Sequence, residues 1–174
     1  AISKANQAQQ SATSAKSNTD AAKAQATSII EEWNRLVTSA QNKISDSNSA
    51  IDTAKQRIKV GEDVIYNATI LGLDTVQAKA QIATARTKVD SAVAYYQEAS
   101  SMFKAATNKE SFEGAKSKAQ SAIDIAKEAE QLATSAYSSL AATLAVAGES
   151  SKAILNANSE VSQMNEIMTK LDYI

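Results

Sequence analysis

IIEEWNRLVTSAQNKISDSNSAIDTAKQRIKVGEDVI, residues 29–65, is the stretch that decides the fold of this chain. Its apolar and small residues recur at spacings of three and four, which places them on one face of an α-helix, whereas a strand would alternate with a period of two. The members of this heptad-like stripe are Ile29, Trp33, Leu36, Ala40, Ile44, Ser47, Ile51, Ala54, Ile58 and Ile65. No Pro occurs among the 174 residues, so long helices are permitted.

Towards the N-terminus the stripe continues, but its apolar members are almost all alanine: Ala5, Ala8, Ala12, Ala15, Ala22 and Ala26. Each alanine buries too little surface to hold a helix against a core alone. Small side chains nevertheless let two helices approach closely. We expect residues 1–35 to form an Ala-rich helical arm that pairs with another copy, docks onto a neighbouring molecule or packs back on its own chain. The alternative is that the first 28 residues fray in solution as a low-complexity tail.

Towards the C-terminus the first predicted stop is NATILGLD, residues 67–74. Gly72 can adopt a positive φ, and Asp74 with Gln77 has the spacing of a capping box. A second helix is predicted from about residue 75 to residue 106. Its expected inward positions are Val76, Ala80, Ala83, Val89, Val93, Tyr96, Ala99 and Phe103.

A third helix is predicted after a capping box of Thr107 and Glu110, with Ser111 as a competing cap. Its stripe contains Ala115, Ala119, Ala122, Ala126, Ala129, Leu132, Ala136, Leu140 and Leu144. Gly148 then allows a turn, although Ile154, Val161 and Met168 keep nearly the same phase, as a continuous helix would. At 1.5 Å per residue the second helix is about 50 Å long, and the third helix reaches the same length before Gly148. Gly148 would therefore lie at the end of the bundle, which favours a turn there and a fourth helix over residues 150–173.

These elements predict a single all-α domain over residues 1–174, an elongated antiparallel helical bundle of four helices. The first helix is very long, residues 1–35 are the arm, and residues 36–174 form the bundle. The alternative is a spectrin-like three-helix bundle in which the first and third helices are both about 60 residues long.

The composition excludes several classes of function. The chain has no His and no Cys, which removes Ser-His and Cys-His nucleophile pairs, thiolate chemistry and zinc sites. A net charge of −1, with 15 Lys and only three Arg, argues against nucleic-acid binding. No stretch is long and apolar enough to be a transmembrane segment. We therefore expect no enzyme activity, no catalytic residues and no cofactor; the start at Ala1 indicates a processed product or a fragment.

Five acidic residues are candidate carboxylate ligands or acid-base groups: Glu31, Glu32, Glu62, Asp63 and Glu166. A di-metal helical bundle needs Glu-x-x-His motifs, and no His is present. We interpret these residues as solvated helix faces and predict no metal site.

Three further features are candidates for binding. Asn67 begins an Asn-Ala-Thr glycosylation sequon, a signal expected by chance in so Ser- and Thr-rich a chain. Trp33 is interpreted as a packing residue that closes the bundle end rather than a recognition hot spot. Ile70, Leu71 and Leu73 form an apolar tip that plugs the bundle end or, if exposed, marks a partner or membrane surface.

The segment ATNKESFEGAKSKAQSAIDIAKEAEQLA within residues 85–136 resembles the Ala-rich helical hairpins of secreted surface proteins of archaea and bacteria. The chain is also similar in style to apolipophorin-like bundles, without their Leu and Phe content, and to chemoreceptor coiled coils, without a recognisable tip motif. The resemblance implies an assembly, spacing or binding role and transfers no functional residue.

The leading hypothesis is a non-enzymatic structural or interaction module, at the cell surface or in a secreted assembly, that binds a protein partner or itself through the arm. One alternative is an amphipathic bundle that opens on a membrane surface. Another is an intracellular, cytoplasmic coiled-coil scaffold or signalling segment. The sequence leaves the partner and the oligomeric state open.

Overall fold

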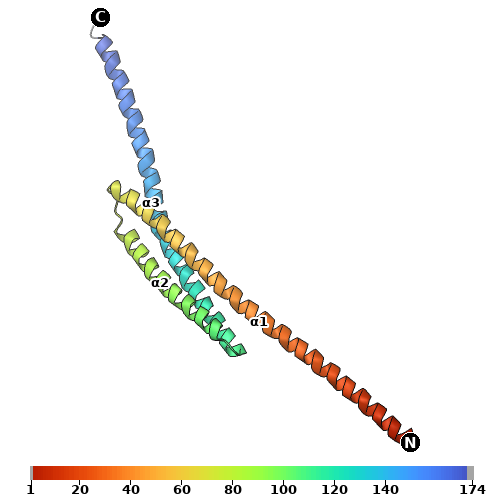
Figure 1. The fold of residues 1–174 in the computed structure, drawn as a ribbon. Coiled ribbons are helices and arrows are strands. Elements are labelled where there is room, and N and C mark those ends of the chain that lie inside the picture. Colours follow the sequence, from red (N-terminus) through yellow and green to blue (C-terminus); the bar gives the residue numbers. More distant parts are fainter. Residues whose placement is uncertain (1, 172–174) are drawn as a thin grey trace. The chain divides into compact units, whose positions relative to one another are not determined.

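The computed structural model describes residues 2–171, and the surroundings of side chains up to residue 164. Over this range the chain consists of three α-helices and no strand (Figure 1). α1 spans Ile2–Ile70, α2 spans Val76–Ala105 and α3 spans Lys109–Leu171. The predicted all-α class is confirmed.

The prediction of four helices is wrong, because α3 passes through Gly148 without a break. Residues 150–173, the expected fourth helix, belong to the second half of α3 as far as the structure describes them. A glycine inside a helix costs only about 1 kcal/mol relative to alanine, which is too little to end a Pro-free helix flanked by good helix formers. Matching the helix lengths predicts a turn only if every turn of the helix is covered, whereas residues 148–164 are all exposed. The described helix count, and the lengths of 69 and 63 residues for α1 and α3, agree instead with the three-helix alternative.

Each helix buries one heptad stripe. In α1 the buried stripe is Ala40, Ser47, Ile51, Ala54, Ile58, Gly61, Ile65 and Ala68, of which Gly61 and Ala68 were not predicted. Of the other predicted members, Leu36 and Ile44 are half-buried, and Ile29 and Trp33 are exposed. In α3 it is Phe112, Ala115, Ala119, Ala122, Ala126, Ala129, Ala133, Ala136 and Leu140, so Ala133 takes the place expected for Leu132. The alanines of the α3 stripe are all 0% exposed, and their small size lets the helices pack closely.

The first turns of α2 have a different register from the predicted one. Val76, Ala80 and Ala83 are exposed, and the buried stripe is Thr75, Ala78, Ile82, Ala85, Val89, Ala92 and Ala99. The predicted stripe breaks its phase with a spacing of six between Ala83 and Val89. The observed stripe keeps spacings of three and four from Thr75 to Ala92 and buries the larger side chain of Ile82.

The turn between α1 and α2 has the glycine of positive φ and the Asp74 cap that the sequence predicts; the amide that Asp74 binds is that of Val76. Gly72 has a φ of 72°, its amide donates to the carbonyl of Thr69 (3.0 Å), and the amide of Leu73 donates to the carbonyl of Ala68 (3.0 Å). This is a Schellman motif, which satisfies the last carbonyls of α1. The carboxylate of Asp74 accepts a hydrogen bond from the amide of Val76 (3.0 Å) and caps α2.

The turn between α2 and α3 is capped by a residue that the sequence interpretation passed over. The amide of Ser111 donates to Oδ1 of Asn108 (2.8 Å), and the Ser111 hydroxyl accepts from the amides of Asn108 (3.2 Å) and Thr107 (3.3 Å). Asn108 is therefore the N-cap and Ser111 its reciprocal partner. The Thr107–Glu110 capping box was placed one residue too early, although Asn is as good an N-cap as Ser or Thr.

The residues that lie close to one another form two compact units. The first comprises Ala1–Asn48 and Val93–Ile123. Phe112 is buried there and makes edge-to-face contacts with Trp33 (ring centroids 5.3 Å apart) and with Phe103 (5.5 Å). These aromatic rings join α1, α2 and α3 in this unit.

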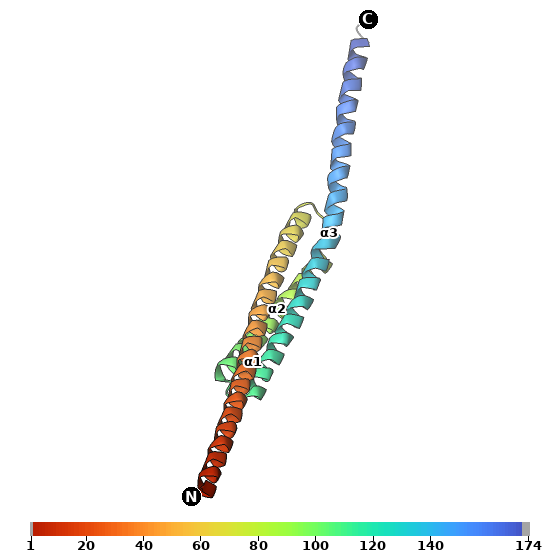
Figure 2. The ribbon, with the colours of Figure 1, turned by 90° about the vertical axis from the view of Figure 1, so that its right-hand side faces the viewer.

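The second unit comprises Ser49–Ala92 and Asp124–Ile174, and its three helix segments lie side by side where their stripes are buried (Figure 1, Figure 2). A Cβ placed on Gly61 would lie 2.6 Å from Cδ1 of Ile82 and 3.6 Å from the carbonyl oxygen of Ala133. A side chain at this crossing of α1, α2 and α3 would therefore require Ile82 to shift. Ion pairs at the rim of the unit, such as Arg57–Glu130 (3.5 Å), are partly exposed and contribute less than the packing.

Candidate functional site

The acidic residues that the sequence offers as candidate ligands lie on helix surfaces where they are described, and two of them form ion pairs. Glu32 pairs with Lys109 (3.4 Å), and Glu62 pairs with Arg86 (2.8 Å). Within the described part of the chain, no three acidic, His or Cys side chains gather closely enough to hold a metal ion. The side chain of Glu166 lies outside the described residues. These carboxylates belong to ordinary helix surfaces.

The Ala-rich arm is exposed along its whole described length, residues 2–35. Ala5, Ala8, Ala12, Ala15, Ala22 and Ala26 all lie on this segment of α1, in the unit that contains residues 1–48. The first buried residue of α1 is Ala40. Among the three predicted roles of the arm, packing back on its own chain is therefore not what this structure shows.

Trp33 lies where the arm meets the packed part of α1. One edge of the indole contacts the buried ring of Phe112, and 40% of the residue remains exposed. Its predicted packing role is supported by this contact.

The apolar tip lies at the turn between α1 and α2. Ile70 and Leu71 are exposed, whereas Leu73 is half-buried. The interpretation that these residues plug the end of the bundle is wrong for the first two. Tyr66 and Val76 join them, and the four exposed side chains are 61–75% accessible.

The sequence interpretation missed Tyr66 and Val76 as part of this tip. Val76 was assigned to the inward stripe of α2, and the correct register moves it outside. Only the stripe through Ala78, Ile82 and Ala85 reaches Val89 with spacings of three and four, and this signal in the sequence would have placed Val76 outside the core.

A shallow groove runs between α1 and α2 beside the tip. Isoleucines form its apolar part, and the ion pair of Glu62 and Arg86 lies at its polar end; the lining residues are Glu62, Ile65, Tyr66, Thr69, Lys79, Ile82, Ala83 and Arg86. Such a groove can receive an apolar side chain or helix face. It brings together no acid-base or nucleophilic pair.

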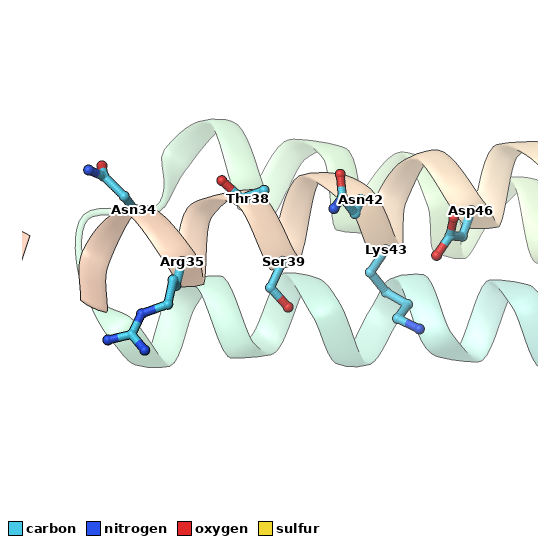
Figure 3. A pocket seen from close by; sticks show the side chains of 7 residues that line it. All are labelled: Asn34, Arg35, Thr38, Ser39, Asn42, Lys43 and Asp46. Carbon is cyan, nitrogen blue, oxygen red and sulfur yellow. The ribbon is translucent and has the colours of Figure 1, made fainter. Parts of the chain in front are cut away.

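A second groove follows the polar side of α1, and Figure 3 shows its seven side chains: Asn34, Arg35, Thr38, Ser39, Asn42, Lys43 and Asp46. All of them come from one helix and project along its length rather than converging on a point. This is a surface between neighbouring side chains and not an enclosed site.

The second half of α3 carries an apolar face with no described covering. Leu144 and Ala147 are half-buried, and Ile154, Leu155, Val161 and Met164 are exposed. The sequence interpretation assigned this segment to the core as a fourth helix. The sequence does indicate this face, because Leu140, Ile154 and Val161 are separated by multiples of seven and so lie on one side of a helix.

Asn67, the residue of the sequon, is exposed in the last turn of α1. Its carbonyl accepts a hydrogen bond from the amide of Leu71 (3.2 Å). Its side chain is accessible, and glycosylation there stays a prediction.

None of the described helices is long and apolar enough to cross a membrane. No family model, curated protein or solved structure matches the chain. The exposed helix faces are therefore the features from which a function has to be argued.

Proposed function

We propose that the chain is an antiparallel helical bundle of the spectrin-like type that works as a non-enzymatic structural and interaction module. The observation that carries this proposal is the exposure of residues 2–35, which continue the stripe that α1 buries from Ala40 onwards. A helix whose small-residue face repeats the pattern of a packed face is suited to pair with another helix. Binding through this arm, to another copy or to a protein partner, is the role we assign.

The energetics favour a partner for the arm. An isolated helix owes little stability to propensity alone, and most helical stability in proteins comes from packing. Six alanines on one face offer close backbone approach, and Trp33 adds a large side chain at the end of that face. Location at a cell surface or in a secreted assembly follows from the resemblance of residues 85–136 and is part of the proposal.

The test compares the full chain with a variant that begins at Ser28, by size-exclusion chromatography with light scattering. The deleted residues contribute none of the described buried side chains, so the packed part should keep its helicity. An assembly that becomes a monomer on deletion supports the proposal. Assembly that survives the deletion, or a full chain that stays monomeric and captures no partner through the arm, contradicts it.

A second candidate function is binding to a membrane surface, and the apolar tip is the observation that favours it. Tyr66, Ile70, Leu71 and Val76 are exposed together at one turn, and such residues insert readily at a lipid interface. The opened-bundle form of this idea is weaker, because the face that α3 would expose consists mainly of alanine. Flotation with liposomes of varied charge tests it: co-flotation lost on Leu71→Asp supports tip insertion, and no flotation contradicts it.

A further inference from the structure

The second half of α3 presents a packing face whose partner is not part of the described fold. α3 buries Leu140, and the same helical face then continues through Leu144, Ala147, Ile154 and Val161. Ile154 is 61% exposed and Val161 is 49% exposed. The established packing face of α3 thus runs on, uncovered, into a segment that we call the tail, residues 141–164.

The arm has the pattern of the packed part of α3. When residues 5–33 are placed against residues 112–140, the stripe spacings coincide throughout and eight of the 29 positions are identical: Ala8/Ala115, Ala12/Ala119, Ser14/Ser121, Ala15/Ala122, Ala22/Ala129, Ala26/Ala133, Thr27/Thr134 and Ser28/Ser135. The five alanines on the α3 stripe among these are each 0% exposed. The arm therefore offers a face of the kind that α3 buries.

The tail, in turn, has the pattern of the packed part of α1. When residues 154–161 are placed against residues 44–51, Ile154, Asn158 and Ser159 are identical to their counterparts Ile44, Asn48 and Ser49, and Val161 stands opposite Ile51. Ile51 is the largest of the fully buried side chains among the described residues, at 2% exposure. The tail therefore offers a face of the kind that α1 buries.

Faces of these two kinds already pack against each other inside the chain. α1 and α3 run in the same direction, because each is antiparallel to α2 through a short turn. In the second unit Arg57 of α1 pairs with Glu130 of α3 (3.5 Å), and Gly61 approaches the backbone of Ala133. Within the chain, one pair of such faces is packed together, that of α1 and α3. The other pair, that of the arm and the tail, is exposed.

We propose that the tail of one copy docks in parallel on the arm of a second copy and repeats the contact between α1 and α3. This inference rests on the proposed function and names its partner. Because the two faces differ, the contact is heterologous: the copy that docks its tail keeps a free arm, and the copy that offers its arm keeps a free tail. Copies would join one after another rather than close as a symmetric pair.

The test uses four full-length double variants. Ala12→Glu with Ala15→Glu places charges on the arm face, and Ile154→Glu with Val161→Glu places them on the tail face. The matched controls are Gln10→Glu with Ser17→Glu, and Asn156→Glu with Gln163→Glu, on the opposite sides of the same helices. All eight positions are exposed, so helicity by circular dichroism should be unchanged.

The expected result, by sedimentation equilibrium, is that the unmodified chain and both controls form concentration-dependent oligomers. The arm-face and tail-face variants should each associate at least about tenfold more weakly, because burying an unpaired carboxylate is costly. Mixed together, they should form a one-to-one complex that grows no further, since only one intact arm and one intact tail remain.

Four results would overturn the inference. If the tail-face variant associates as well as the unmodified chain while the arm-face variant does not, arms pair with arms; the proposed function then stands and tail docking fails. If the mixed variants stay monomeric, or the controls weaken association equally, the face assignment is wrong. An unmodified chain that stays monomeric at every concentration rules out self-docking, and partner capture through the arm then decides the proposed function separately.

Discussion

Replacing Gly148 with alanine tests whether α3 runs unbroken into the tail. Gly148 is helical and exposed, and no atom lies within 4 Å of the position that a Cβ would take, so alanine adds no clash. Alanine is favoured over glycine inside a helix by about 1 kcal/mol, and we expect most of this gain to stabilise the tail. A gain of about 1 kcal/mol changes a local opening equilibrium by about fivefold.

The assay is amide hydrogen exchange of residues 144–152, with helicity at 222 nm as a second readout. Exchange should slow by about fivefold, while global stability changes little, because the side chains of residues 148–164 are exposed. Gly72→Ala is the matched control: Gly72 has a φ of 72°, and alanine there should destabilise the turn by about 1–2 kcal/mol. If Gly148→Ala instead lowers helicity as Gly72→Ala does, Gly148 is a turn and the continuous α3 is wrong.

Three further substitutions test the packed part. Gly61→Val overpacks the crossing of the three helices, where even a Cβ would lie 2.6 Å from an isoleucine methyl of α2, and urea denaturation should show a loss of about 1–3 kcal/mol. Phe112→Ala removes the buried ring between two aromatic neighbours and should cost about 3–5 kcal/mol; since Trp33 is the only tryptophan, its fluorescence should shift to the red, and unchanged emission would contradict the contact. Asn108→Ala removes the N-cap of α3 and should cost about 1 kcal/mol, whereas Thr107→Ala should be nearly neutral; equal losses in thermal unfolding would refute the cap assignment.

Much of the fold followed from two properties of the sequence, the absence of Pro and the spacing of three and four. The stripe from Ala40 to Ile65 and the turn at Gly72 were predicted because phase and a positive φ are local properties that a sequence records directly. The register of the first turns of α2 was not predicted, because two stripes compete there, one that contains Val76 and one that contains Ile82. Which of them is buried depends on packing against α1 and α3.

Gly148 shows where local signals fail. A glycine is permissive and does not by itself end a helix, so its role depends on whether the flanking residues have another packed conformation available. The expectation of a turn came from requiring the helix to be covered within its own chain. The exposure of both the arm and the tail shows that these segments do not meet that requirement.

Of the candidate surfaces, one could be predicted from the sequence and two needed the structure. The arm could be predicted, since a stripe made of alanine is weak as a core and suited to close helix pairing. The tip needed the structure, because Ile70 and Leu71 could equally have closed the end of a bundle. The tail as a docking face could be inferred only once α3 was known to be continuous and its face uncovered.

The central claim is that the uncovered halves of α1 and α3 are docking faces between copies. The most direct measurement is sedimentation equilibrium of the unmodified chain at concentrations from about 1 µM to about 1 mM, a range that covers weak and moderate association. The account predicts an average mass that rises above the 18.3 kDa of one chain and continues to rise past that of a pair. A mass that stays at 18.3 kDa throughout would contradict it.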